Sequence, residues 1–313
     1  MASSSEAPIF VGGSGRCGTT VLVNTLGLHP RIFTFPDELR LLTAGNENLI
    51  DWMHSPGSRR LGDSLRQGLR GGFTSGAAFR EAIRTPRRAS FASRFRQLRE
   101  GSFFTRPVAR NAQDVGLCRA IPIEDYRRAV AQLLETFPNG TMPQRRAEVR
   151  AFMETCSAAA LEESGAARWC DGTPDNVLHM IDLAAIFPGA RFIHIIRNGA
   201  DVARSFYRLG WSPSTTSALR RWHESVATGR AFGRTLGPEQ YMEVDFDTFL
   251  DAPESTLRGV VSFLGESWSP ELEAHDVRRS AVAKGEATSD PELDRLYESL
   301  ARSLGESEGR SST

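Results

Sequence analysis

The stretch Pro8–Thr20, PIFVGGSGRCGTT, decides the fold expected for this chain. Its apolar residues 9–11 are typical of a buried strand, and a glycine-rich turn follows them. The glycines let backbone N–H groups approach an anion, and a helix from Thr19 to about Leu28 adds N–H donors and positive potential. The stretch therefore predicts a strand, a phosphate-binding loop and a helix, in that order.

The loop differs in one position from the phosphate loop of nucleoside triphosphate-binding proteins. Read against GxxxxGK[ST], residues 13–20 keep both glycines and the final Thr, but Thr19 stands in the position of Lys. That Lys bridges the β- and γ-phosphates, so its absence argues against a γ-phosphoryl donor. The residues expected to bind an anion here are Gly13, Ser14, Gly15, Arg16, Cys17, Gly18, Thr19 and Thr20.

A second pattern of strand, turn and helix begins at residue 192. Phe192–Ile196 is a continuous apolar run, typical of a strand buried in a parallel sheet. Arg197 follows at its carboxyl end, where open α/β sheets bind ligands, and Ser205 lies eight residues further on. A guanidinium and a hydroxyl together suit a phosphate dianion. Arg204 or Arg208 is the candidate for a third contact.

Both segments resemble the sulfotransferases that use 3′-phosphoadenylyl sulfate (PAPS). Residues 15–20, GRCGTT, are similar to the PRSGTT pattern of their 5′-phosphosulfate loop, with Gly for Pro and Cys for Ser. Arg197, the turn at 198–201 and Ser205 resemble the motif that binds the 3′-phosphate of the donor. The later segments 245–254 and 257–265 also resemble structural segments of this family.

The resemblance implies a catalytic base after the second expected strand, Ile32–Phe35. An HP-x-I stretch followed by Glu38-Leu39-Arg40 is similar to tyrosylprotein sulfotransferases and many bacterial ones, in which the Glu of an E-T-R motif is the base. Glu38 is accordingly the expected base, and Asp37 is the alternative if the register differs by one. Such a carboxylate takes the proton of the acceptor hydroxyl. The structural alternative is an ordinary acidic pair at a helix N-terminus.

One departure from the family concerns the segment 168–176, RWCDGTPDN. The family's W-x-x-K-T-P segment brings a Lys to the bridging oxygen of the donor, and Gly172 stands in that position. Lys284 is the only lysine of the chain. The charge of the leaving group is therefore stabilised by Arg16, a loop N–H, Arg40 or another arginine, or catalysis proceeds without that contact. Lys284 lies where such enzymes often carry a lid over the cofactor, and it is a further candidate ligand of the donor.

The chain of 313 residues is expected to form a single α/β domain over 6–303, followed by a disordered tail over 304–313. The domain is a P-loop-type central parallel sheet flanked by helices, with helices expected over 176–187 and 211–236. Helical periodicity from about 43 to 167 predicts a helical insertion after the second strand, and the resemblance implies that this insertion binds the acceptor. Its thirteen arginines between 59 and 110 favour a solvated surface over a basic mouth for anions.

Composition argues against several classes of protein. The formal net charge is zero, so nothing draws the whole chain toward nucleic acid. No apolar run approaches the roughly 20 residues of a membrane span, and polar residues 1–7 show no signal peptide, which favours a cytoplasmic location. The four cysteines and six histidines lack metal-ligand spacing, so no metal is expected.

These observations predict a PAPS-dependent sulfotransferase. Its acceptor is expected to be a hydroxyl or amine of a small molecule, lipid or carbohydrate, and the sequence gives no indication of oligomeric state. Two alternatives stay open at this point: a P-loop small-molecule kinase that uses ATP, and a catalytically inactive nucleotide-binding homologue, which Gly172 favours.

Overall fold

A five-stranded parallel sheet forms the centre of the molecule. The computed structural model describes residues 6–35, 38–39, 42–43, 48–54, 122–137, 140–277 and 290–309. In the order β2-β3-β1-β4-β5, every neighbouring pair of strands is parallel, so the carboxyl ends of all five strands lie at one edge. The strands are β1 (Ile9–Gly12), β2 (Ile32–Thr34), β3 (Arg168–Asp171), β4 (Arg191–Ile196) and β5 (Tyr241–Asp245). The predicted α/β class is thereby confirmed.

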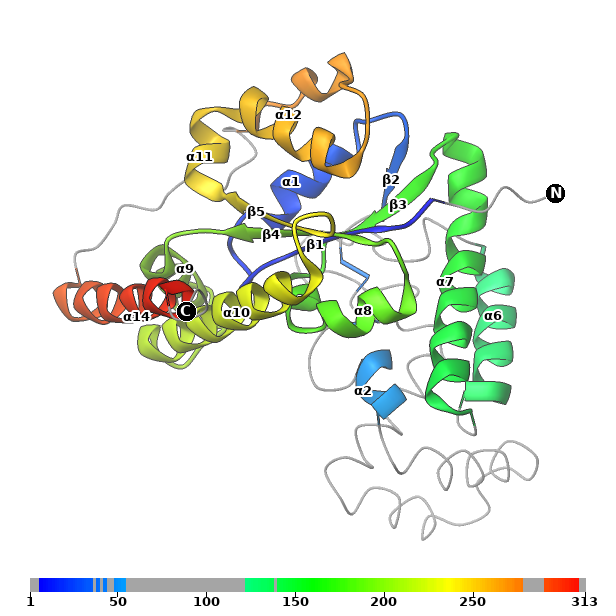
Figure 1. Ribbon diagram of the computed structural model, residues 1–313, viewed down its shortest axis with the longest axis horizontal. Helices are drawn as coiled ribbons and strands as arrows, with labels where there is room; N and C mark the ends of the chain where they lie inside the picture. The colour runs from blue at the N-terminus through cyan, green and yellow to red at the C-terminus, as the bar shows by residue number, and fades with distance from the viewer. Residues whose placement is uncertain are drawn as a thin grey trace, which may run out of the picture.

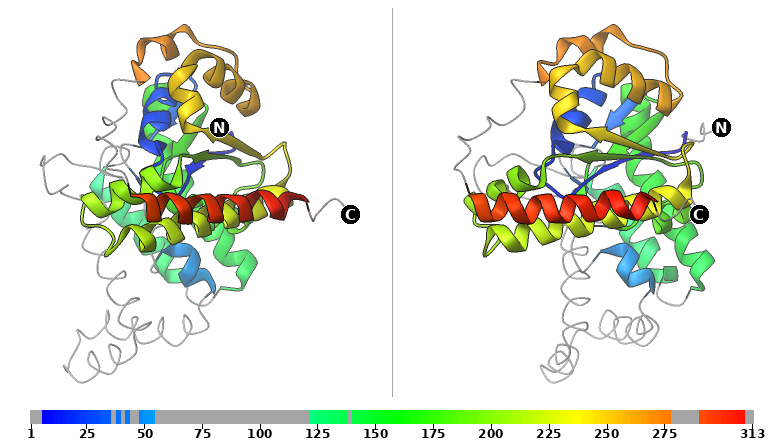
Figure 2. Two further views of the ribbon diagram at one scale, coloured as in Figure 1. Left: turned by 90° about the vertical axis from the view of Figure 1, so that its left-hand side faces the viewer. Right: turned by 60° about the vertical axis from the view of Figure 1, so that its left-hand side comes forward.

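Helices cover both faces of the sheet (Figure 1). One face carries α1 (Thr19–Leu26), α11 (Phe246–Asp251) and α12 (Pro253–Leu264). The other carries α8 (Met180–Ile186), α9 (Gly199–Arg208), α10 (Thr215–Leu236) and α14 (Pro291–Gly309). Two short 3₁₀ helices, η3 (Pro174–Leu178) and η4 (Pro270–Ala274), lie in connections. Seen from the side, α14 lies along α9 and α10, outside the sheet (Figure 2).

The alternation of side chains along β1 builds a separate core on each face. Ile9 and Val11 are fully buried in the cluster that contains α1 and α12. Phe10 points to the opposite face, where its ring lies 5.4 Å from Trp169 and 5.5 Å from Phe192 between ring centres. Because both faces are covered, the central strands read as unbroken apolar runs in the sequence.

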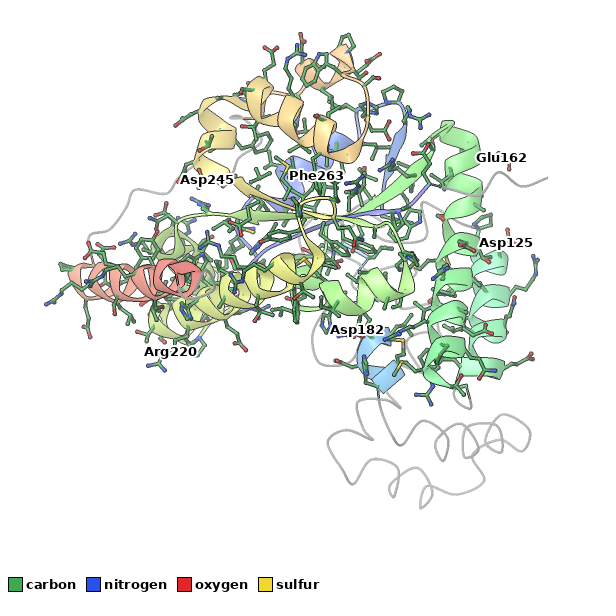
Figure 3. The ribbon with its side chains drawn as sticks, in the orientation of Figure 1. Asp125, Glu162, Asp182, Arg220, Asp245 and Phe263 are labelled. Carbon is green, nitrogen blue, oxygen red and sulfur yellow. The ribbon has the colours of Figure 1, made fainter. Side chains whose placement is uncertain are left out.

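The described part of the insertion is helical, as predicted. It contains α2 (Leu49–His54), α6 (Ile123–Thr136) and α7 (Met142–Ser164), of which α6 and α7 pack together and α7 contacts β2 and β3. Buried Arg145 of α7 donates hydrogen bonds to the carbonyls of Phe137 and Met53, which ties α2 to the helix pair. His54 of α2 also lies 2.8 Å from Asp182 of α8; Asp182 is labelled in Figure 3. Residues 55–121, which include all thirteen arginines between 59 and 110, lie outside the described ranges.

Several helix bounds differ from expectation. The helix expected over 176–187 is divided into η3 and α8 at His179, whose φ of −130° is not helical. The helix expected from residue 211 begins only at Thr215, because Pro213 follows a turn and the Ser214 side chain caps the helix by accepting from the Ser217 N–H at 3.1 Å. At the other end of the chain, α14 continues to Gly309, into the stretch 304–313 for which a disordered tail was expected.

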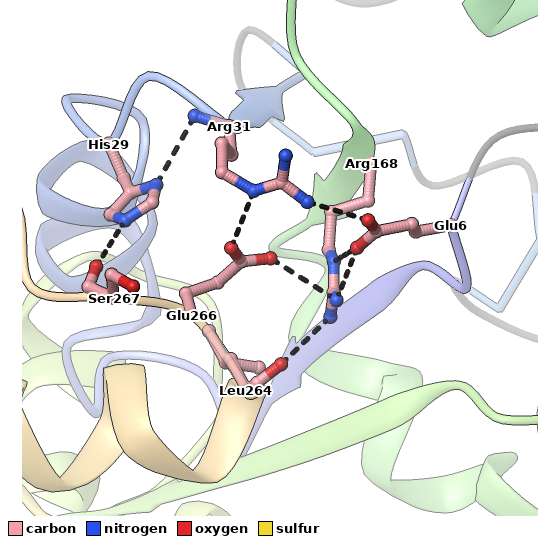
Figure 4. Close-up of polar contacts among 7 residues, drawn as sticks. All are labelled: Glu6, His29, Arg31, Arg168, Leu264, Glu266 and Ser267. Carbon is pink, nitrogen blue, oxygen red and sulfur yellow. Dashed lines mark hydrogen bonds and ion pairs between the residues drawn. The ribbon is translucent and has the colours of Figure 1, made fainter.

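The amino edge of the sheet carries a compact group of paired charges (Figure 4). Arg31 bridges Glu6 at 2.6 Å and Glu266 at 2.8 Å, and Arg168 bridges the same two carboxylates at 2.7 and 3.2 Å. Glu266 is almost fully buried, with 3% of its side chain exposed. The hydrogen bond from Arg168 is the main cause of a lowered pKa at Glu6. These ion pairs connect the N-terminal ends of β1, β2 and β3 to the C-terminal end of α12.

Within the described ranges, no helix combines the length and the apolar character that crossing a bilayer requires.

Candidate active site

The loop between β1 and α1 adopts a conformation that depends on its glycines. Gly15 and Gly18 have φ values of 79° and 102°. At Gly13 a Cβ atom would lie 2.4 Å from the Cys17 Sγ and 2.6 Å from the Ile195 carbonyl oxygen, so no side chain fits there. Arg16, with φ 55°, is the only non-glycine residue in the described ranges with positive φ. Such a conformation is unfavourable for a side-chain-bearing residue and is concentrated at functional sites.

Two buried side chains hold the loop from within. The Cys17 thiol is fully buried, and this burial raises its pKa, although backbone N–H groups of Gly15 and Thr19 act in the opposite direction. Ser14 is also buried, and its Oγ donates to the Gly15 carbonyl at 3.2 Å. Both side chains therefore fix the conformation of the loop.

The two predicted anion-binding motifs meet at the carboxyl edge of the sheet. Arg16 Nε donates to Ser205 Oγ at 3.2 Å, and Arg197 Nη1 donates to the Arg16 carbonyl at 3.3 Å. The backbone of Arg197 is fixed in turn, because Trp222 Nε1 donates to its carbonyl at 3.0 Å. Residues from the β1 loop, the end of β4 and helix α9 thus form a single cluster.

This cluster has more positive charge than its carboxylate neutralises. Burial lowers the pKa of Arg16, and the charges of Arg197 and Arg208 lower it further. The Arg197 guanidinium is 13% exposed, and its nearest described carboxylate, Asp201 Oδ2, lies 3.7 Å away. The Nε of Arg197 is buried and has no hydrogen-bond partner among the described residues. A doubly charged phosphate satisfies both requirements, a counter-charge and an acceptor.

Phe246, the first residue of α11, supports both motifs. Its ring lies 5.0 Å from the Arg197 guanidinium, within cation–π range. The same ring lies against the loop, because a Cβ at Gly18 would come within 2.3 Å of it. Sequence reasoning gave the segment 245–254 only a structural role, and the pattern contained no signal for this contact.

The carboxylate segment lies beyond β3, on the opposite side of β1 from Arg197. Glu38 is half-buried and follows β2, and its neighbour Leu39 donates its N–H to Asp171 Oδ1 at 3.1 Å. Asp37, Arg40 and Lys284 lie outside the described residues, so their predicted roles stay predictions. The order β2-β3-β1-β4 therefore places the phosphate loop between Glu38 and Arg197.

The position in which the family has a Lys is closely packed in this chain. A Cβ at Gly172 would lie 2.8 Å from Cγ2 of Val23, a buried residue of α1. Gly172 therefore belongs to the contact between β3 and α1. Among the described residues, Arg16 is the cation placed within the phosphate loop itself, which keeps it the leading candidate to stabilise the leaving group.

No group of three His, Cys, Asp or Glu side chains in the described ranges is arranged to hold a metal ion. The expectation of a metal-free reaction remains a prediction.

Comparison with known proteins finds one matching family model. Residues 122–270 match the model of the sulfotransferase family, a range that contains Arg197 and Ser205 and begins after the phosphate loop. This range is just under half of the chain, and over it the chain is similar to the sulfotransferase family. It is accordingly a sulfotransferase-type enzyme, and the family match favours this activity over the kinase alternative.

Solved structures share the fold of this sulfotransferase. The sulfotransferase domain of the olefin synthase of Synechococcus PCC 7002 aligns with a TM-score of 0.50 at 18% identity, over 96% of this chain and 98% of that one. The sulfotransferase domain from the curacin biosynthetic pathway aligns with a TM-score of 0.52 at 15% identity, over 96% and 99%. At such identities the likeness shows a common fold.

Sequence analysis also failed to predict that an exposed aromatic residue lies beside the loop between β1 and α1. Trp211 has 63% of its surface exposed, and its ring centre lies 5.6 Å from the Arg16 guanidinium carbon. Its ring meets the Phe206 ring of α9 in an edge-on arrangement, with 5.9 Å between the two ring centres. The residue had been assigned to the start of a helix, whereas it lies in the turn that precedes α10.

Proposed function

We propose that this sulfotransferase transfers the sulfuryl group of PAPS to a hydroxyl or amine of a small-molecule, lipid or carbohydrate acceptor. The observation that carries the proposal is the meeting of Arg16, Arg197 and Ser205 at the carboxyl edge of the sheet, with Arg197 Nε buried and unpaired among the described residues. This edge is where open parallel sheets bind nucleotides.

The donor is held at two places in this proposal. The N–H groups of the β1 loop, with Thr19 and Thr20, bind the 5′-phosphosulfate. Arg197 and Ser205 bind the 3′-phosphate, and Arg16 lies between the two groups. When bound, the donor supplies a sulfuryl group on a phosphate leaving group. The shared hydrogen bonds keep the two binding places at a fixed separation, which orients the sulfur for attack.

Glu38 acts on the acceptor. As the acceptor oxygen forms its bond to sulfur, its proton passes to a Glu38 carboxylate oxygen, and the electrons of the breaking S–O bond leave with the phosphate. Arg16 and the loop N–H groups stabilise the charge that develops on that phosphate. Asp37 remains the alternative base.

Calorimetric titration with adenosine 3′,5′-bisphosphate tests the donor site. We expect micromolar binding by the wild type and, because a charged hydrogen bond contributes about 1.5–3 kcal/mol, binding at least about tenfold weaker by Arg197→Ala. The matched control is Arg191→Ala, which removes an arginine from the amino end of the same strand, where its guanidinium lies over the Phe263 ring. Equal losses in both variants would indicate an effect of net charge and contradict the site.

Two further measurements separate the alternatives. ATP with magnesium, titrated in parallel, should bind much more weakly than the bisphosphate. Tighter binding of ATP would favour the hypothesis of a P-loop kinase. Glu38→Gln should keep bisphosphate affinity and lose turnover, because the amide is not basic. Near-normal turnover in Glu38→Gln would exclude Glu38 as the base. Bisphosphate binding by the wild type without transfer to any tested acceptor would favour an inactive homologue.

A further inference from the structure

The carboxylate of Asp171, the last residue of β3, lies at the centre of a buried hydrogen-bond network. Asp171 has no exposed surface. Its Oδ1 accepts from the Leu39 N–H at 3.1 Å, the Thr173 N–H at 3.3 Å and the Thr173 hydroxyl at 3.0 Å. Its Oδ2 accepts from Asn176 Nδ2 at 3.0 Å. Four donors thus surround a single carboxylate.

Asn176 extends this network in two directions. Its Nδ2 also donates to the Val11 carbonyl in β1 at 3.2 Å, and its Oδ1 accepts from the Thr43 hydroxyl at 2.8 Å. The adjacent Pro174 carbonyl accepts from the Gly13 N–H at 2.9 Å. The turn 171–176 is therefore bonded to the phosphate loop on one side and to residues 39 and 43 on the other.

Loss of any of these hydrogen bonds would lower the stability of the folded protein. A buried carboxylate is tolerated only when donors surround it, and each donor that loses its partner carries a desolvation cost. The described residues 38–39 and 42–43 lie in no helix or strand, so their backbone has no regular ladder to hold it. The Leu39 N–H is therefore fixed by Asp171, and Leu39 is the residue directly after Glu38.

We propose that Asp171 is a positioning residue, which fixes the segment carrying Glu38 at a set distance from the phosphate loop. Asn176 transmits the same constraint to β1 and to Thr43. The role concerns geometry: a displacement of the base by about 1 Å costs on the order of a hundredfold in rate. This inference rests on the proposed function, in which Glu38 is the base, and it deepens that function by naming what places the base.

The test compares Asp171→Asn with the wild type in three measurements. The substitution keeps the size of the side chain and replaces one acceptor oxygen by an NH₂ group that meets a donor. We expect kcat for transfer from PAPS to 4-nitrophenol, used as a probe acceptor, to fall at least tenfold. The dissociation constant of adenosine 3′,5′-bisphosphate should stay within threefold. Amide hydrogen exchange at Leu39 should accelerate at least tenfold.

A double variant shows whether Asp171 acts through Glu38. If it does, Glu38→Gln/Asp171→Asn is no slower than Glu38→Gln alone, because the residue being positioned has already lost its function. Multiplicative losses would overturn the proposal, and so would a loss of bisphosphate affinity that parallels kcat. Unchanged exchange at Leu39 would overturn it as well.

Two other variants complete the design. Asp175→Asn changes a carboxylate in the same turn, one that pairs with Arg221 at 3.2 Å, and it should leave all three measurements unchanged. If Asp171→Asn fails to fold, Thr43→Val removes the hydrogen bond to Asn176 and should shift kcat and Leu39 exchange in the same direction by a smaller factor. If the wild type binds no bisphosphate, the proposed function fails, and Leu39 exchange still decides whether Asp171 orders the segment.

Discussion

The side chains of Arg16 and Ser205, 189 positions apart in the chain, are joined by a hydrogen bond of 3.2 Å from the guanidinium Nε to the hydroxyl Oγ. The bond connects a loop that follows β1 to a helix that follows β4. The two proposed donor-binding motifs are therefore held as one unit, and a substitution in either motif should also affect the other.

The first prediction concerns Ser205→Ala. Loss of the hydroxyl removes a phosphate ligand and releases Arg16, so we expect bisphosphate affinity to fall by about tenfold, as for loss of a hydrogen bond to a charged group. Titration calorimetry measures the change. Ser212→Ala is the control, because that hydroxyl donates only to the Ser214 carbonyl in the following turn. Undiminished affinity in Ser205→Ala would remove Ser205 from the site.

The second prediction uses Trp211 as an optical reporter. The ring is exposed and lies beside the Arg16 guanidinium, so a phosphate that binds Arg16 changes the electrostatic field at the indole. We expect the tryptophan emission to change as the bisphosphate is titrated, and most of that change to disappear in Trp211→Phe. A signal of the same size in Trp211→Phe would place the anion elsewhere.

The third prediction concerns the packing at Gly172. Replacement by Lys would force Val23 to move, so Gly172→Lys should lower the free energy of unfolding by about 1–3 kcal/mol, the usual cost of overpacking. Urea denaturation measures this loss. In the background Val23→Ala, adding Gly172→Lys should cost less, because the methyl group in contact is gone. An equal cost in both backgrounds would show that Val23 is not the obstacle.

The fourth prediction is a pH dependence that arises from His194 in β4. Its Nδ1 lies 2.8 Å from the Tyr241 hydroxyl. That hydroxyl donates to Glu243, which also pairs with Arg230. The Nε2 of His194 is buried and has no hydrogen-bond partner among the described residues. Burial lowers the pKa of His194 to about 4. The folded-state pKa is thus below the unfolded value of about 6.5, so the neutral ring's contribution is complete above pH 6.5 and is lost as the pH falls toward 4.

The size of this contribution is about 3 kcal/mol, from the difference between the two pKa values. His194→Gln cannot titrate, so its free energy of unfolding should fall less than that of the wild type between pH 7 and pH 4. Denaturant melts at three pH values in that window provide the comparison. Parallel curves for the two proteins would show that His194 does not control this loss.

Much of the fold was predictable because its signals are contiguous. The run 9–11 with its glycine loop, and Phe192–Ile196 followed by Arg197, each contain strand, turn and helix in unbroken order. Strand β3 was not predicted as a strand, since only four residues form it and its ends are Arg168 and Asp171. The pattern of the sequence is ambiguous at this length.

The parts of the site that escaped prediction depend on distant partners. Asp171 receives the N–H of Leu39 from 132 positions away, and no local pattern marks a residue for such a bond. Phe246 touches Gly18 and Arg197 only because β5 lies beside β4 in the sheet. Gly172 could be recognised as a departure from the family, whereas the contact with Val23 that fills its place is visible only in three dimensions.

Charged side chains are balanced at the amino edge of the sheet and unbalanced at its carboxyl edge. At the amino edge two carboxylates balance Arg31 and Arg168. At the carboxyl edge Asp201 pairs with Arg204 at 3.4 Å and with Arg197 at 3.7 Å, and the charges of Arg16 and Arg197 repel each other. An anion relieves the repulsion between the latter two. In the proposed reaction the spent nucleotide keeps both phosphates that these arginines bind, so it relieves the repulsion as well as the donor does. We therefore expect the enzyme to release its product slowly and to be inhibited by it.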